Sequence, residues 1–120
     1  VAEDNPINGE IAETFLRAFG FEVDLVLNGK DAVDKFTGSP EGTYSLILMD
    51  IQMPVMNGYD AVRQIRACEQ TDAKNIPILA MSANAFQEDV ARSLDSGMNE
   101  HLSKPIDIEK LFHSISKYID

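Results

Sequence analysis

Two continuous apolar runs constrain the fold of this chain more than any other feature of its sequence. One run, Leu46–Met49, ends at Asp50, and the other, Ile76–Met81, ends at Ser82. Apolar runs of this length, bounded by polar residues, are typical of strands buried on both faces, and such strands occur in parallel sheets. The sequence therefore predicts a carboxylate and a hydroxyl group at the carboxyl edge of one sheet, where open α/β folds bind their ligands.

Strands and helices are predicted to alternate five times. Strands are expected at residues 1–3, 21–25, 44–49, 76–81 and around 98–102, and helices, marked by apolar residues at helical spacing, over 6–19, 29–38, 61–68, 86–94 and 108–119. Such alternation requires parallel pairing through right-handed crossovers, with helices on both faces of the sheet. The first strand is shorter than the usual length of about 5–6 residues, so we expect about three or four of its residues to lie upstream of Val1.

Composition narrows the functional classes. The 120 residues suffice for one domain, and the content of 44% apolar and 25% charged residues is typical of a soluble globular protein. A net charge of −10 disfavours nucleic acid and anionic membrane as direct partners. No apolar run approaches the roughly 20 residues that span a bilayer. The single cysteine, Cys68, favours a reducing, cytoplasmic setting.

Four predicted strand ends carry chemically active side chains: Glu3 with Asp4, then Asp50, Ser82 and Lys104. Adjacent strands lie about 5 Å apart, so the three carboxylates are expected to crowd together. Like charges at that range repel each other unless a cation is bound, and Mg²⁺ takes oxygen ligands of this kind. The alternative is an acidic rim without a metal ion.

The same set suits phosphoryl transfer, in which positioning and electrostatics supply most of the catalysis. Asp50 would supply the attacking oxygen, while Mg²⁺ and Lys104 neutralise the transferring group. Ser82, or backbone N–H groups near Ile51 and Gln52, would donate hydrogen bonds. The alternative role for Ser82 is to cap the helix that follows it.

Four stretches carry a family resemblance in their order and spacing: Val1–Asn5, Leu46–Gly58, Met81–Ala85 and Leu102–Pro105. On these stretches the chain resembles a response-regulator receiver domain of the CheY-like family. The resemblance implies one receiver domain over residues 1–120, truncated in its first strand. It also implies a flavodoxin-like (βα)5 sandwich, whose five-stranded parallel sheet has the order 2-1-3-4-5 with helices on both faces.

The resemblance assigns roles to individual residues. Asp50 corresponds to the phosphoacceptor, and Lys104 to the lysine that pairs with the phosphoryl group. Asp4 corresponds to a direct Mg²⁺ ligand, Glu3 to a ligand acting mostly through water, and the backbone carbonyl of Gln52 to a further ligand. Mn²⁺ is expected to substitute for Mg²⁺.

Two further positions concern switching. Ser82 corresponds to the hydroxyl residue that responds to phosphorylation. His101 stands where the family usually has a rotating Tyr or Phe, so it is either an unusual switch residue or a surface residue. His113, on the last helix, is interpreted as structural or solvent-facing.

The resemblance also implies partners. The phosphoryl donor would be a histidine kinase or a histidine phosphotransfer domain, docked on the first helix near Ile7 and Ile11. The fourth helix and fifth strand would form the output face, which is also the candidate dimer surface. A weaker similarity is to C-terminal receivers of hybrid sensor histidine kinases, including those anchored in membranes; a stand-alone receiver is the alternative. The domain would assist its own phosphorylation and dephosphorylation without being an enzyme in the ordinary sense.

Three other functions are alternatives to this one. A haloacid-dehalogenase-like phosphatase would need an acid two residues after its nucleophile, and Gln52 cannot transfer a proton. A nucleotide- or flavin-binding module would need a glycine- or hydroxyl-rich phosphate loop after the first strand, and the acidic stretch there would repel phosphate. The third rival is a receiver that no longer accepts phosphate and serves only in protein interaction.

Overall fold

The structure is a computed structural model, and it describes residues 1–40, 42–53, 55–68, 71–82, 91–92, 94–103 and 107–118. Its strands are β1 (Ile47–Asp50), β2 (Ile78–Ser82) and β3 (Glu100–Ser103), which form a parallel sheet in the order β1-β2-β3. Its helices are α1 (Pro6–Ala18), α2 (Gly29–Thr37), α3 (Gly58–Ala67) and α5 (Ile108–Ser116), with a 3₁₀ turn, η1, at Thr71–Lys74. Most of the predicted fourth helix lies outside the described residues. Within them, no helix combines the length and the hydropathy needed to cross a bilayer.

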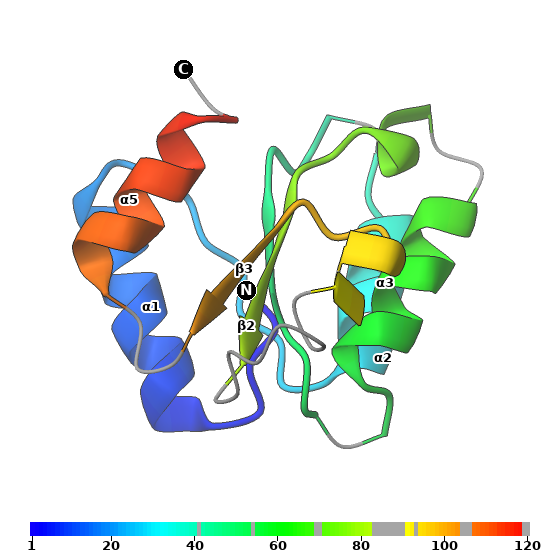
Figure 1. Ribbon diagram of the computed structural model, residues 1–120, viewed down its shortest axis with the longest axis horizontal. Helices are drawn as coiled ribbons and strands as arrows, with labels where there is room; N and C mark the ends of the chain where they lie inside the picture. The colour runs from blue at the N-terminus through cyan, green and yellow to red at the C-terminus, as the bar shows by residue number, and fades with distance from the viewer. Residues whose placement is uncertain are drawn as a thin grey trace.

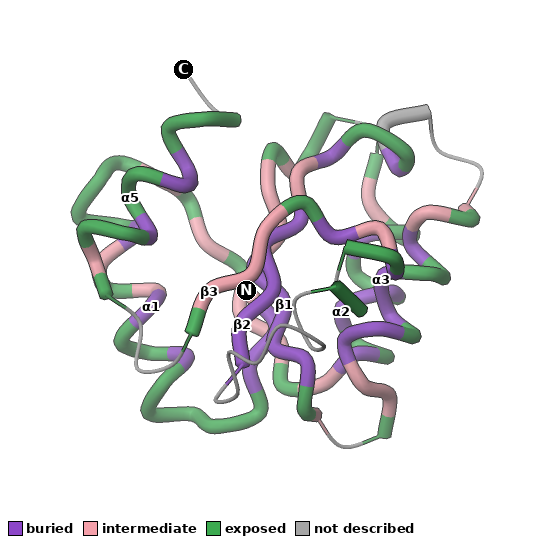
Figure 2. The backbone as a smooth tube through the Cα atoms, in the orientation of Figure 1, coloured by how far each residue is buried: buried purple, intermediate pink, exposed green. Residues whose placement is uncertain are grey.

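The helices form two layers around the sheet, with α1 and α5 on one face and α2 and α3 on the other (Figure 1). Side chains alternate between the two faces of a strand. Leu48 and Leu79 accordingly pack in a cluster with Leu111 and Ile115 of α5, while Met49 packs in the cluster formed by α2 and α3. Strands β1 and β2 are largely buried, and exposed residues lie on the outer surfaces of the helices (Figure 2). The prediction of an α/β sandwich is confirmed.

The edge near the N-terminus differs from the prediction. Residues 1–3 and 21–25 do not form regular strands; Ala2 instead makes isolated parallel bridges to Val26 on one side and to Met49 on the other. The Val26 amide donates to the Val1 carbonyl over 2.9 Å, the Glu3 amide donates to the Val26 carbonyl over 3.0 Å, and the N-terminal ammonium group of Val1 donates to the Asp24 carbonyl over 2.8 Å. A regular strand requires consecutive residues that pair with a neighbouring strand. The alternating pattern of 21–25 therefore does not produce a strand there.

The inward face of α1 also differs from the apolar face predicted for it. The buried residues of α1 are Gly9, Ala12 and Leu16. Ile7 and Ile11, two of the apolar residues at helical spacing that marked this helix in the sequence, are 69% and 49% exposed. The helix therefore presents two large apolar side chains to solvent.

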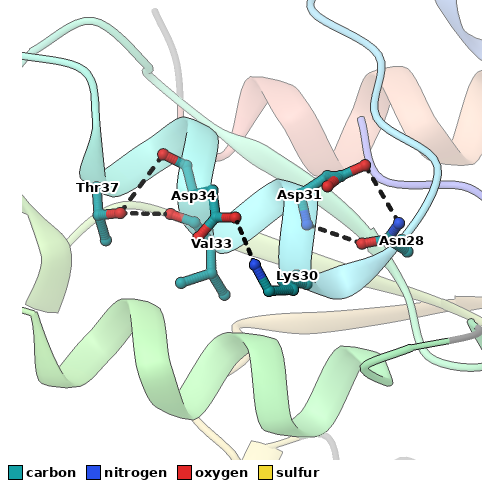
Figure 3. A network of polar contacts seen from close by, with 6 residues as sticks. All are labelled: Asn28, Lys30, Asp31, Val33, Asp34 and Thr37. Carbon is teal, nitrogen blue, oxygen red and sulfur yellow. Dashed lines mark hydrogen bonds and ion pairs between the residues drawn. The ribbon is translucent and has the colours of Figure 1, made fainter.

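The start of α2 is fixed by a local polar network (Figure 3). The Asn28 side chain accepts a hydrogen bond from the Asp31 amide over 2.8 Å and donates one to the Asp31 carboxylate over 3.2 Å, an N-terminal cap. Lys30 and Asp34 form an ion pair one turn apart, at 3.1 Å. The network sets the position of Gly29, whose amide donates to the carbonyl of Met56 over 3.1 Å. The first turn of α2 is thus joined to the loop that follows Asp50.

Arg66 of α3 joins three segments on the same side of the sheet as α2. Its guanidinium group donates to the Gly97 carbonyl over 2.8 and 3.1 Å, to the Ala73 carbonyl over 3.0 Å and to the Asn99 side chain over 3.0 Å. Asn99 also accepts a hydrogen bond from the Ile78 amide over 2.9 Å. One side chain therefore connects α3, η1 and the turn that enters β3.

Replacing Arg66 by Met is expected to lower the free energy of unfolding by about 1–3 kcal/mol, because the acceptors it satisfies would lose their donor. Urea denaturation measures the change. Arg63→Met is the matched control: this arginine of α3 makes only an exposed ion pair with Asp60 at 3.5 Å among the contacts described, and its loss is expected to change stability by less than about 0.5 kcal/mol. Equal losses in the two variants would contradict this account.

Candidate functional site

Three carboxylates meet at the carboxyl end of β1. Oxygen atoms of Glu3, Asp4 and Asp50 all lie within 4.8 Å of one another. Ala2 brings the first two there, because its bridge to Met49 places residues 3 and 4 beside the end of β1. Glu3 and Asp50 are each only 2% exposed, whereas Asp4 is open to solvent. The structure therefore assembles the acidic cluster that the strand ends predicted.

Backbone amides contribute donors to this cluster. The Gln52 amide lies 3.4 Å from Oδ1 of Asp50, and the Asn5 amide lies 3.3 Å from Oε1 of Glu3. Both are long hydrogen bonds. The amide of Ile51 is held by the carbonyl of Met81 over 3.0 Å, which joins the end of β1 to the end of β2.

The first turn of α3 packs against the backbone of the acidic residue itself. A Cβ atom on Gly58 would lie 2.4 Å from the carbonyl oxygen of Asp50, so only glycine fits there. Gly29 is equally confined, with its Cβ position 2.2 Å from the carbonyl oxygen of Met56. Thus α2 begins in contact with Met56, and α3 begins in contact with Asp50. Sequence reasoning did not identify these contacts, although an Asn-Gly pair stands at the start of each helix and could have indicated them.

The loop between Asp50 and α3 contains a strained residue. Val55 has φ of +68°, although β-branched side chains strongly disfavour the left-handed region, and it is 78% exposed. Backbone strain of this kind, of order 1–3 kcal/mol, is concentrated at functional loops. The strain at Val55 supports assignment of this residue's loop segment, residues 55–57, to the site.

Ser82 ends β2 at the same edge of the sheet. It is 4% exposed and lies opposite Ser103, the last residue of β3, while His101 of β3 lies opposite Ala80 and is half-buried. Lys104, the predicted cation of the site, follows Ser103 directly but lies outside the described residues.

A surface depression of about 460 Å³ lies next to the acidic cluster. Its lining includes Gln52, Ser82, Tyr59 of α3 and Arg92 of the helical residues 91–92. The Arg92 guanidinium carbon lies 4.2 Å from the centre of the Tyr59 ring. Sequence reasoning missed both residues, since no local pattern links a residue of α3 to one more than 30 positions later.

An ion pair joins β3 to the end of α5. Lys117 donates to Glu100 over 2.7 Å. Burial alone would raise the pKa of Glu100, but hydrogen bonds from Lys117 and Ser114 outweigh it and hold that pKa below its ordinary value. The hydrogen bond to Glu100 correspondingly raises the pKa of Lys117. This pair stabilises part of the predicted output face.

Replacing Glu100 by Gln is expected to lower the free energy of unfolding at neutral pH but not in acid. Because the pKa of Glu100 is lower in the folded state, the ionised carboxylate contributes its full stabilisation at pH values above the ordinary pKa of 4.5. This contribution disappears as the pH falls through the folded-state pKa. Urea denaturation across this pH range measures the effect, with the exposed Glu109→Gln of α5 as the control. The assignment would be contradicted if the difference in the free energy of unfolding between Glu100→Gln and the unsubstituted chain grew as the pH fell below 4.5.

Comparison with known proteins gives matches over nearly the whole chain. The family model described as "Response regulator receiver domain" matches residues 1–116. Hybrid signal transduction histidine kinase L of Dictyostelium discoideum is 40% identical over 119 residues, which covers 98% of this chain and 7% of that protein. The chain therefore spans only a small part of such relatives.

Two solved structures are similar in both fold and sequence. The receiver domain of sensor histidine kinase PA1611 from Pseudomonas aeruginosa has 39% identity and a TM-score of 0.85, covers 98% of this chain and 92% of its own, and holds a magnesium ion in its active-site cleft. The receiver domain of Ssk1 from Saccharomyces cerevisiae, solved in complex with the histidine phosphotransfer protein Ypd1, has 34% identity and a TM-score of 0.85 and covers 98% and 84%.

Proposed function

The chain belongs to the response-regulator receiver domain family, and on that premise we propose that it accepts a phosphoryl group from a phosphohistidine onto Asp50 in a two-component phosphorelay. The clustering of Glu3, Asp4 and Asp50 at one sheet edge, beside Ser82, is the observation that carries the proposal. Residues 1–120 would act as one receiver domain, either within a hybrid histidine kinase or as a stand-alone regulator.

The full sheet is inferred to have the five-stranded order 2-1-3-4-5. The pairing of Val26 with Ala2, of Ala2 with β1, and of β1, β2 and β3 in succession supports this order. It would place residues 3 and 4 next to Asp50, on the inner side of the segment that contains Val26. Flavodoxin-like folds such as that of CheY have this strand order.

The acidic cluster fits a small hard cation. Mg²⁺ binds carboxylate oxygens at about 2.0–2.1 Å and keeps several waters, so oxygens within 4.8 Å of one another can hold it directly or through a water. Asp4, Asp50 and the Gln52 carbonyl would be direct ligands, with Glu3 acting mostly through water and Mn²⁺ as an alternative ion. When bound, the cation neutralises charge on the transferring group. The magnesium ion in the related PA1611 receiver supports this assignment.

The residues of this chain would divide the transfer step among them. An oxygen of the ionised Asp50 carboxylate would attack phosphorus, forming a P–O bond as the P–N bond to the donor histidine breaks; no separate base is required. The Gln52 amide, already next to Oδ1, and the Ser82 hydroxyl would donate to the phosphoryl oxygens. Lys104 would pair with the product phosphate as a point charge.

Phosphorylation would change the output face through Ser82. The new group adds about −1.5 to −2 charges and three acceptor oxygens at the end of β1. Ser82 is buried beside β3. Its movement toward the phosphate would therefore change the packing around His101, the candidate second switch residue. The face containing β3 would then present a different surface to an output partner or to a second copy of the domain.

The proposed phosphoryl donor is a histidine kinase or a histidine phosphotransfer domain docked on α1. Ile7 and Ile11 are exposed on this helix, and its N-cap, Asn5, directly follows Asp4. Exposed apolar side chains beside a polar site mark interaction surfaces. The complex of the related Ssk1 receiver with Ypd1 supports a partner of this class.

Incubation with Mg²⁺ and acetyl phosphate is expected to add one phosphate to the chain, and Asp50→Asn is expected to abolish the adduct, because the amide lacks the nucleophilic carboxylate oxygen. Intact-mass spectrometry measures both. Retention of the adduct in Asp50→Asn would show that another residue accepts the phosphate. A folded chain that forms no adduct at all would favour a domain that serves only in protein interaction.

Replacing Ile7 and Ile11 by Ser is expected to slow phosphotransfer from a phosphorylated histidine phosphotransfer protein such as Ypd1, while phosphorylation by acetyl phosphate stays unchanged. Docking requires the apolar surface of α1, whereas the chemistry of Asp50 does not. The exposed Leu94→Ser is the control. An equal loss with both donors would indicate damage to the site instead of loss of docking.

A further inference from the structure

The contact between Tyr59 and Arg92 lies beside the proposed phosphorylation site but has no role in the mechanism above. Tyr59, the second residue of α3, is only 5% exposed, whereas Arg92 is exposed to solvent. The guanidinium carbon lies 4.2 Å from the ring centre, well within the range of a cation–π interaction. An exposed, charged side chain thereby covers a buried ring.

Tyr59 is connected to Asp50 by a short series of backbone contacts. The residue before it, Gly58, donates its amide to the Ile51 carbonyl over 2.8 Å and packs against the Asp50 carbonyl. Ile51 in turn donates to the Met81 carbonyl over 3.0 Å. Ile51 is therefore held from both sides, and it lies between the phosphoacceptor and Gln52 in the chain.

The backbone of Gln52 directly follows these contacts in the chain. Its side chain is exposed, and the hydrogen bond found for its amide within the described residues is a long one, 3.4 Å to Oδ1 of Asp50. Its position depends on how firmly the first turn of α3 holds Ile51. The depression that Gln52 shares with Tyr59, Arg92 and Ser82 brings all four residues to one surface.

We propose that Arg92 is a positioning residue for the phosphorylation site. By holding the Tyr59 ring, it keeps the first turn of α3 against Ile51, and this fixes the Gln52 backbone for the cation and for the phosphoryl group. The inference rests on the proposed function, since it assigns Arg92 a role toward that same site. Arg92 acts through Tyr59 and the backbone, and it is not a catalytic residue.

The test compares variants that separate the charge of Arg92 from its bulk. Arg92→Met keeps the aliphatic stem and removes the charge, Arg92→Lys keeps the charge, and Arg63→Met removes another exposed arginine. Calorimetry measures the Mg²⁺ affinity, and intact-mass spectrometry measures the rate of phosphorylation by acetyl phosphate at subsaturating Mg²⁺. Arg92→Met is expected to weaken Mg²⁺ binding and slow phosphorylation by about two- to fivefold, the effect of losing one cation–π contact. Arg92→Lys is expected to restore most of both.

A double substitution tests whether Arg92 acts through Tyr59. Arg92→Met is expected to have little further effect once Tyr59→Leu has removed the ring, whereas it should keep its full effect in Tyr59→Phe, which retains the ring. Because Arg92 is exposed, its replacement opens no cavity, and urea denaturation of each variant verifies that the chain remains folded.

The outcomes distinguish this inference from the proposed function. If the unsubstituted chain neither binds Mg²⁺ nor takes up phosphate, the proposed function fails and the role of Arg92 fails with it. If the unsubstituted chain does both, and Arg92→Met matches Arg63→Met in affinity and rate, the role of Arg92 is overturned while the proposed function stands. Equal losses in Arg92→Met and Arg92→Lys would also overturn it, because the charge is retained in the second variant.

Discussion

Burial of β1 and β2 on both faces is the constraint from which the rest of the structure follows. Met49, Ile78, Leu79 and Ala80 have no exposed surface, and Leu48 has 1%. Removing apolar surface from water stabilises the fold by about 25 cal/mol per Å², and a strand gains this on both faces only when helices cover each of them. The two helical layers and the parallel crossovers are consequences of that requirement. So is the delivery of Asp50 and Ser82 to one edge.

The desolvation and repulsion of the clustered carboxylates are offset by the packing of the backbone around them. Two carboxylates at 2% exposure beside a third carry a desolvation penalty and mutual repulsion. The backbone around them is held by contacts that do not depend on charge, notably the packing of Gly58 on the Asp50 carbonyl. The scaffold can therefore keep the acidic residues together, and a cation can relieve the repulsion on binding.

Sequence reasoning succeeded where the relevant pattern is local. The apolar runs predicted the buried strands, and the acidic residues at two predicted strand ends predicted the acidic cluster. Sequence reasoning failed where an element or a contact depends on residues that are far apart in the sequence. The alternation over 21–25 suggested a strand, but a ladder depends on its neighbour, and only Val26 bridges to Ala2. The periodicity of α1 could not distinguish Leu16, which is buried, from Ile7, which is exposed. The contacts of Arg66 with Gly97 and of Arg92 with Tyr59 join residues about 30 positions apart, which no periodicity can reveal.

The central claim is that the three carboxylates form one cation site that prepares Asp50 for phosphorylation. A titration with Mg²⁺, followed by the amide ¹H and ¹⁵N chemical shifts of the labelled chain, tests it most directly. The account predicts saturable shifts concentrated at Asp4, Asn5 and residues 50–53, and their loss in Asp4→Asn. Shifts that do not saturate, or that centre on other acidic residues such as Asp31 and Asp34 of α2, would contradict it.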